Sequence, residues 1–143
     1  MRPAQEADQS AIKKLIREAG INPFGLHWSR FIVAVDDNQQ ITGCGQVKSH
    51  RDGSLELASL AVHQERRNQG IAGAIIRELQ EKHGRPLWLT CMDRLVPFYE
   101  PFGFVVIDEL SQMPRYFRTA SRFFNLFWIF SRGNGRLAVM VWR

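Results

Sequence analysis

The sequence predicts an α/β fold of the mixed α+β kind, in which helices cover a sheet of parallel and antiparallel strands. Three observations predict it. Short apolar runs separated by turn residues fill residues 31–63, as in antiparallel strands. Apolar residues at helical spacing follow over 72–83. Further strand-like runs and a short helical segment alternate from residue 86 onward. The 143 residues fit a single domain that buries its own core.

The first elements are a helix and three strands. Apolar residues at helical spacing predict the helix, with Asp8 as N-cap and Gly20 just past its end: Ile12, Leu15, Ile16 and Ala19. Strands are expected over 31–35, 41–47 and 55–63, joined by turns at 36–38 and 51–54.

The third of these strands carries an irregularity. Leu55 and Leu57 share one phase of the strand alternation, whereas Leu60 and Val62 share the other. Because a strand repeats every two residues, this change of phase predicts a β-bulge near 58–59.

The later elements alternate between helix and strand. A helix over 72–83 is expected to end at Gly84, and a buried strand covers 86–92. A short helical turn over 97–101 leads to a strand over 104–107, and the final strand covers 137–142.

The loop before the second helix has the composition of an anion site. Arg66 and Arg67 supply positive charge, and the small residues Gly70, Ala72 and Gly73 leave the first helical amides open to a bulky ligand. Those amides lack intrahelical partners and carry partial positive charge, which suits a phosphate or pyrophosphate. An ordinary helix start is the structural alternative. The strings of a P-loop and of a Rossmann fingerprint are both missing.

Two segments resemble the motifs of one known family. Residues 62–72, VHQERRNQGIA, resemble the acyl-CoA signature of GNAT N-acyltransferases, Arg/Gln-x-x-Gly-x-Gly/Ala. Residues 98–104, FYEPFGF, resemble the second hallmark of that superfamily, Phe-Tyr-x-x-x-Gly-Phe. The order of elements agrees over nearly the whole chain. The resemblance implies a GNAT fold, with a mixed central sheet of about six to seven strands that splay beside the bulge at the acyl-CoA site.

The resemblance also implies roles for particular residues, with acetyl-CoA (coenzyme A) as the acyl donor. Glu56 would act as the base, directly or through water, with a solvated or salt-bridged strand glutamate as the alternative and His63 as a weaker candidate base. Tyr99 would act as a general acid for the departing thiolate; the alternative is a packing aromatic that hydrogen-bonds the cofactor sulfur without donating a proton. Backbone groups of Leu60, Ala61 and Val62 would pair with the pantetheine arm. The pyrophosphate would be bound by the loop and helix start: Arg67, Asn68, Gln69, Gly70, Ile71, Ala72 and Gly73.

The implied function is N-acetyl transfer to a primary amine, on a small molecule or a protein, by direct attack in a ternary complex. Met92 stands where many relatives carry Asn, which keeps a degenerate acyl-CoA-binding regulator as an alternative. A basic module that binds membrane or nucleic-acid surfaces is a second alternative. The acceptor amine is not identified by the sequence.

The net charge of +5 is local to the last third of the chain. Residues 1–110 carry 13 basic and 14 acidic side chains, whereas residues 111–143 carry six arginines and no acid. A basic aromatic helical segment is expected over about 114–133, with Arg115, Arg118 and Arg122 on one face. Relative to the family that the motifs resemble, it would be an insertion, because most small relatives have a short turn there. It would cover the sheet edge or form a dimer contact, wall the acceptor pocket, or attach to a membrane or nucleic-acid surface. Its aromatic and small residues lie on other faces: Phe117, Ala120, Phe124, Phe127 and Trp128.

The remaining features predict few partners. Cys44 and Cys91 fall in apolar strands, which favours two reduced, buried thiols over a disulfide or a thiol nucleophile. The four histidines lack ligand spacing, so no metal is expected. Without an apolar leader or a membrane-length run, a cytoplasmic location is expected. Nucleic acid is not the expected partner, and a homodimer stays open.

Overall fold

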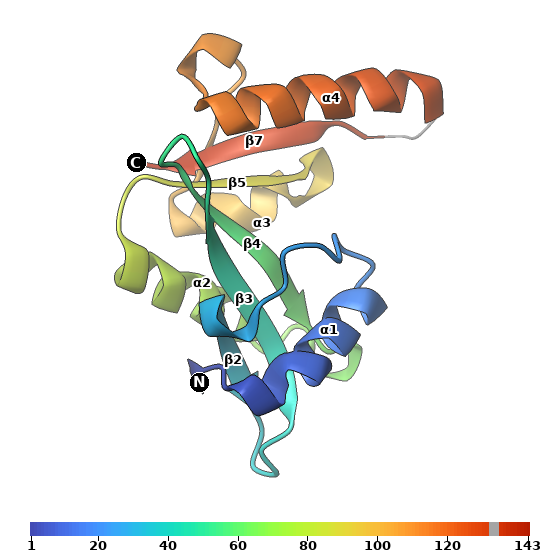
Figure 1. The fold of residues 1–143 in the computed structure, drawn as a ribbon, viewed down its shortest axis with the longest axis vertical. Helices are drawn as coiled ribbons and strands as arrows, with labels where there is room; N and C mark the ends of the chain where they lie inside the picture. Colours follow the sequence, from blue (N-terminus) through green and yellow to red (C-terminus); the bar gives the residue numbers. More distant parts are fainter. Residues whose placement is uncertain (132–134) are drawn as a thin grey trace. The chain divides into compact units, whose positions relative to one another are not determined.

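The computed structural model describes the backbone of residues 1–131 and 135–143, and the side chains of residues 1–124 and 135–143 (Figure 1). The chain forms two compact units. The first unit comprises residues 1–48 and 57–84, and the second unit comprises residues 49–56 and 85–143. The strand hairpin at 49–56 therefore belongs to the second unit.

The first unit holds the N-terminal strands and two helices. Strand β2 pairs antiparallel with β3, as the predicted turn between them requires, and also with β1, a two-residue strand that lies outside the predicted ranges. The predicted strands and helices appear at the expected places. Their bounds are β1 Arg2–Pro3, α1 Gln9–Glu18, β2 Phe31–Val35, β3 Ile41–Ser49, β4 Leu55–Val62 and α2 Ile71–His83.

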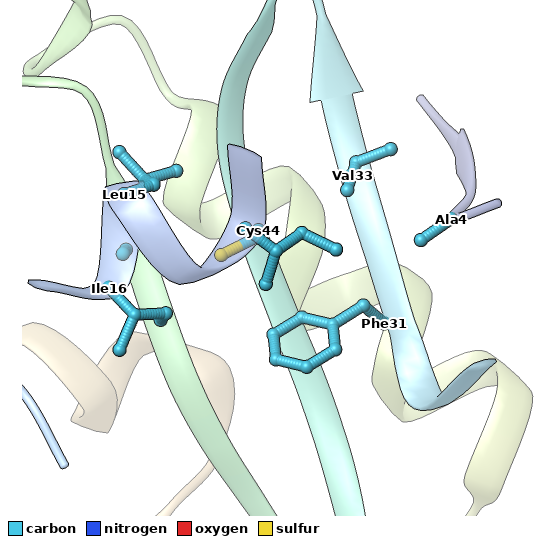
Figure 2. Packing of buried hydrophobic residues seen from close by; sticks show 8 residues of the cluster. Ala4, Leu15, Ile16, Phe31, Val33 and Cys44 are labelled. Atoms are coloured by element: carbon cyan, nitrogen blue, oxygen red, sulfur yellow. The ribbon is translucent and has the colours of Figure 1, made fainter. Parts of the chain in front are cut away.

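Helix α1 packs on the strands through the face that the sequence predicts. Ile12, Leu15 and Ile16 are buried, at the spacing that places them on one side of a helix. Figure 2 shows Leu15 and Ile16 over the strands that carry Phe31, Val33 and Cys44. The first turn deviates in one detail. Asp8 occupies the N-cap position, but its carboxylate accepts hydrogen bonds from the Gln5 amide and from Arg2 instead of capping α1.

Helix α2 lies close to β3 because two glycines of that strand leave room for it. A Cβ atom at Gly43 would lie 2.8 Å from Cγ2 of Ile71, and one at Gly45 would lie 2.7 Å from Cγ2 of Ile75. Distances this short do not occur between real Cβ atoms and their neighbours. The two glycines therefore set the distance between the helix start and the sheet.

The second unit holds the remaining strands around β7. Strand β7 pairs antiparallel with β5 along its whole length and with β6, and β4 runs parallel to β5 with Glu56 opposite Trp88. The elements are β5 Leu87–Met92, α3 Val96–Tyr99, β6 Val105–Val106, α4 Arg115–Ser131 and β7 Leu137–Trp142.

Strand β6 is shorter than the sequence predicts. The expected strand over 104–107 reduces to Val105 and Val106, although the Ile107 amide still donates to the Val139 carbonyl at 2.9 Å. Phe104 and Ile107 are buried, whereas Val105 and Val106 are exposed at the end of the strand order. In the apolar run over 104–107, the two end residues are therefore apolar because they are buried, and only the two middle residues form the strand.

The strands join in the order β1-β2-β3-β4-β5-β7-β6, so the predicted mixed sheet of six to seven strands is confirmed with seven. In the described part of the chain, no helix combines the length and hydropathy that a transmembrane span needs.

Helix α4 is the predicted basic aromatic helix, and it packs within the second unit. Figure 1 shows it lying along β7. Phe117 is fully buried and stacks on Trp88 at 5.5 Å, in a cluster with Met113, Val139 and Val141. The first half of this helix therefore packs on β5 and β7, whereas the sequence predicts a cover for the sheet edge, which is β6 in this unit. Phe127 and Trp128 lie outside the residues whose side chains are described.

The start of α4 is fixed by two polar contacts. The Asp52 carboxylate accepts a hydrogen bond from the Tyr116 amide at 2.8 Å, and it also accepts from Ser54. A carboxylate at the positive end of a helix acts as an N-cap, here supplied from a distant turn. Arg118 donates to the carbonyls of Leu110 and Met113, at 3.0 and 3.2 Å. One of the three predicted surface cations is therefore bound to backbone carbonyls.

We expect Gly45→Ala to lower the free energy of unfolding by about 1–3 kcal/mol, the usual cost of overpacking. The new methyl group would press on Ile75 and Leu79, both fully buried. Urea denaturation measures the loss. In the double variant Gly45→Ala with Ile75→Ala, the cost should fall below the sum of the two single costs. Additive costs would show that α2 is not held by this contact.

We expect Asp52→Ala to lower the free energy of unfolding at pH 7 by on the order of 1 kcal/mol, the usual cost of losing a helix cap. Hydrogen bonds from Ser54 and Tyr116 lower the pKa of Asp52 from 3.8 to about 2. The charged carboxylate therefore stabilises the fold above about pH 4, and this contribution disappears as the pH falls through about 2.

Asp52→Asn is the matched control, since its amide oxygen still accepts from the Tyr116 amide but does not titrate in this range. Its stability relative to wild type should improve as the pH falls from 4 towards 2. A constant difference between the two proteins over that range would contradict the assignment.

Candidate active site

The loop between β4 and α2 turns back on itself at two residues with left-handed backbone. Asn68 has φ of 63° and Gly70 has φ of 78°. Glycine is the usual residue in this conformation, and Asn is one of the few others that adopt it readily. The residue types at positions 68 and 70 are thus compatible with the backbone that they adopt.

Helix α2 begins without a side-chain cap. Gly70 is its N-cap residue and has no side chain to donate or accept. The first intrahelical bond runs from the Ala74 amide to the Gly70 carbonyl at 3.0 Å. The amides of Ile71, Ala72 and Gly73 precede that bond, so the helix leaves them for an external acceptor. The helix dipole adds partial positive charge at the same place.

The two arginines before the loop are not equivalent. Arg66 forms an ion pair with Asp36, with Nη2 and Oδ2 3.3 Å apart. Arg67 is exposed, and its Nε donates to the Val62 carbonyl at 3.4 Å. Arg66 is therefore engaged within the first unit, while the guanidinium of Arg67 retains further N–H groups.

The predicted pantetheine segment, Leu60 to Val62, forms the end of β4. Just before it, Ser59 has φ of 55°, which interrupts the regular strand at the place where the change of alternation predicts a bulge. Gln46 is fully buried and donates from Nε2 to the Ser59 hydroxyl at 2.7 Å, while its Oε1 accepts from Arg30. Sequence reasoning missed Gln46, because a polar residue inside an apolar strand carries no local pattern of its own.

Tyr99 ends α3 and is buried among aromatic rings. It meets Phe98 edge to face at 4.9 Å and Phe104 at 6.0 Å. Burial, followed by the effect of Cys91, raises the pKa of the phenol well above its usual value of 10. Among the described residues, none hydrogen-bonds to its hydroxyl. Tyr99 therefore stays protonated at neutral pH and keeps its O–H free to donate.

Glu56 is buried near the start of β4 and is paired with a histidine. Its Oε2 lies 2.7 Å from Nε2 of His50, and both side chains are largely withdrawn from water. His50 is a residue that sequence reasoning missed as a partner, because it was judged only for metal-ligand spacing. Its place just before the turn over 51–54, with Glu56 just after it, is the local pattern that could have predicted the contact.

The two cysteines are free thiols, one in each unit, as predicted. Burial raises the pKa of Cys44 to about 12 and, with a contribution from Asp93, that of Cys91 to about 11. A thiol with so high a pKa is a poor nucleophile at neutral pH, since the thiolate is the reactive form. Among the described residues, no group of three or more metal-binding side chains comes together.

The predicted site residues fall in both units. The residues expected to bind the cofactor backbone and pyrophosphate lie on one continuous strand, loop and helix of the first unit, over 60–62 and 67–73. The two residues expected to act in the chemistry, Glu56 and Tyr99, lie in the second unit.

Several solved structures share this fold. N-acetylglutamate synthase from Neisseria gonorrhoeae, complexed with coenzyme A and N-acetyl-glutamate, matches 99% of this chain with a TM-score of 0.74 and 20% identity. Rv2747 from Mycobacterium tuberculosis, in complex with CoA and NLQ, matches 98% of this chain with a TM-score of 0.72 and 21% identity. An N-acetyltransferase from Staphylococcus aureus matches 98% with a TM-score of 0.69 and 14% identity.

The lengths of these proteins differ. The chain spans about a third of the Neisseria synthase, 34% of its length, but 96% of Rv2747 and 98% of the Staphylococcus protein. At these identities the likeness concerns the fold. No curated protein matches the sequence.

The family is decided by a sequence model instead. The model described as "Acetyltransferase (GNAT) domain" matches residues 27–106, more than half of the chain, including the loop before α2 and both hallmark segments. The chain therefore belongs to the GNAT acetyltransferase family.

Proposed function

We propose that this protein transfers an acetyl group from acetyl-CoA to a primary amine, by direct attack of the amine within a ternary complex. The observation that carries the proposal is the uncapped start of α2, where an exposed loop with two left-handed residues leads to amides without side-chain partners. Such a helix start suits the diphosphate of coenzyme A. Coenzyme A is present in two of the matched structures, which supports the choice of ligand.

In this proposal the first unit binds the cofactor. The amides of residues 67–72 take the pyrophosphate oxygens, and Gly73 permits close approach. Arg67 adds a full positive charge from the loop, since it is exposed and retains free donors. Leu60, Ala61 and Val62 offer backbone groups to the amide-rich pantetheine arm, which would add to β4 as a further strand does.

Glu56 is proposed as the base. A primary amine is protonated at neutral pH, and it must lose that proton before its lone pair can attack the thioester carbon. A carboxylate that is buried and held by one hydrogen bond is placed to accept the proton. The N–C bond then forms as the C–S bond breaks: the electrons leave on the CoA sulfur as a thiolate, and the attacking nitrogen releases its second proton to water.

Tyr99 is proposed to stabilise that thiolate. A thiol has a pKa near 8.5, whereas burial raises the pKa of Tyr99 above 10. Complete proton transfer from the phenol to the thiolate is therefore uphill. Tyr99 acts chiefly as a hydrogen-bond donor to the developing charge, and the thiol takes its final proton from water after release.

The acceptor amine is open. One matched structure holds N-acetyl-glutamate, the acetylated product of an amino acid, so amino acids belong in any acceptor panel. Binding of CoA without turnover is the rival function, and Met92 at the end of β5 is the departure from the family pattern that favours it.

We expect Ala72→Asp to abolish CoA binding while leaving the fold intact. A carboxylate in the first turn of a helix interacts favourably with the dipole, so α2 is not weakened. The same carboxylate repels a diphosphate. Isothermal titration with CoA should show a loss of at least about 100-fold in affinity, as expected for like charges at close range. Ala72→Ser is the matched control and should bind normally. Unimpaired CoA binding by Ala72→Asp would place the diphosphate elsewhere.

We expect acetyl-CoA to release free thiol with at least one amine of a panel that spans amino acids, peptides, polyamines and amino sugars. With that amine, Tyr99→Phe should lower kcat by about 10- to 100-fold, the value of a hydrogen bond to a charged group, and should leave the KM for acetyl-CoA nearly unchanged. An unaltered kcat would assign Tyr99 to packing. CoA binding without thiol release from any amine would favour the non-catalytic alternative.

A further inference from the structure

The hairpin between β3 and β4 places a histidine against the proposed base. The amide of His50 donates to the Ser54 carbonyl, and the Gly53 amide donates to the His50 carbonyl, both at 3.0 Å. These two bonds close the turn and fix the backbone of His50. The imidazole then reaches Glu56, and Nε2 lies 2.7 Å from Oε2.

This contact is shielded from water. Only 14% of the His50 side chain and 10% of the Glu56 side chain are exposed. Hydrogen bonds to an ionised carboxylate are stronger than neutral ones, and low exposure strengthens them further. The pair is therefore a firm constraint on the orientation of the carboxylate, unlike an exposed ion pair on a strand.

The imidazole is held on its other face by the inserted helix. The ring of Tyr116 stacks on that of His50 with centroids 3.4 Å apart and planes 12° apart, and Phe117 meets the same ring edge-on at 5.9 Å. Tyr116 is itself fixed by Asp52, and Phe117 by Trp88, the residue opposite Glu56 on β5. These contacts link the first turn of α4, the turn over 51–54 and strand β5 around the His50–Glu56 pair.

These contacts leave Oε1 of Glu56 without a hydrogen-bond donor among the described residues. Among the described residues, His50 alone hydrogen-bonds to Glu56, and it does so at Oε2. If the His50 hydrogen bond served only to satisfy a buried carboxylate, its loss would not change turnover. If it turns Oε1 towards the amine, its loss lowers turnover, since proton transfer requires the acceptor atom at hydrogen-bond distance.

We propose that His50 is the positioning residue of the base: it holds Oε2 of Glu56, so that Oε1 accepts the proton of the acceptor amine, and the first turn of α4 holds the imidazole in place. This inference rests on the proposed function. It also gives the inserted helix a role in the chemistry, through Tyr116, without requiring α4 to touch the acceptor.

The test compares two replacements of His50 that remove different halves of its role. His50→Phe keeps a ring to stack on Tyr116 but has no donor for Glu56. His50→Gln keeps an N–H donor of similar reach but has no ring. We expect His50→Phe to lower kcat by about tenfold or more, as for a mispositioned catalytic group, with the KM for acetyl-CoA unchanged. We expect His50→Gln to retain kcat within about threefold, since its donor keeps the carboxylate oriented.

A structural role predicts the opposite order, because stacking would then matter more than the donor. Equal or greater kcat in His50→Phe than in His50→Gln, at saturating acetyl-CoA, would overturn the inference. If His50→Phe does not fold, His50→Asn replaces it, since its amide is one methylene shorter than that of Gln and does not reach Oε2. If His50→Asn has the same kcat as His50→Gln, the inference is equally overturned.

Glu56→Gln separates this inference from the proposed function. If Glu56 is the base, Glu56→Gln lowers kcat by about 100-fold or more, and adding His50→Phe to it has no further effect, because the two residues act as a unit. Unchanged kcat in Glu56→Gln would remove Glu56 from the chemistry. A large loss in Glu56→Gln with none in His50→Phe would leave the base assigned and reject His50 alone.

Discussion

The start of α2, which has no side-chain cap, is the feature on which the proposed cofactor site of the first unit depends. A helix start without a side-chain cap is a liability in a purely structural helix, because its first amides and its dipole remain without a partner. The surrounding residues preserve that state. Gly70 and Asn68 give the loop its left-handed turns, and Gly43 and Gly45 let the helix approach β3. Gly43 and Gly45 serve packing, and Asn68 and Gly70 serve the backbone of the loop. Together they place the helix start that the proposed function assigns to the diphosphate.

The second unit is organised around a buried carboxylate. Glu56 lies on a short strand segment that the hairpin at 49–56 brings next to β5. A buried charge is costly unless it is hydrogen-bonded, and His50 supplies the bond. The inserted helix α4 then closes over the imidazole, with Phe117 in the core of the unit and Asp52 at the helix start. Packing and polar contacts thus converge on one ionisable pair.

The arginines of the basic aromatic segment over 114–133 show that not every cation in a sequence is available to a partner. Six arginines without an acid between them favour a basic surface when they are read as a string. In the structure, Arg118 serves the backbone carbonyls of Leu110 and Met113. In the first unit, Arg66 is likewise paired with Asp36, whereas Arg67 has no ion pair among the described residues. Counting charges overestimates how many are available to a partner.

The sequence by itself determined the elements whose pattern is local. Helices α1 and α2, the strands from β2 to β5 and β7, and the irregularity at Ser59 follow from periodicity and from turn residues, which act over a few positions. The family motifs are equally local, because a loop and the helix start after it are contiguous in the chain. Only the tertiary structure decided the partners of Glu56, the close approach of α2 to Gly43 and Gly45, the capping of α4 by Asp52 and the shortness of β6. The last three of these features join residues far apart in the chain or depend on what lies at a sheet edge. The pairing of His50 with Glu56 is local, but it depends on the path of the turn between them. A pattern of residue types records which side chains prefer burial, but not which distant group each one meets.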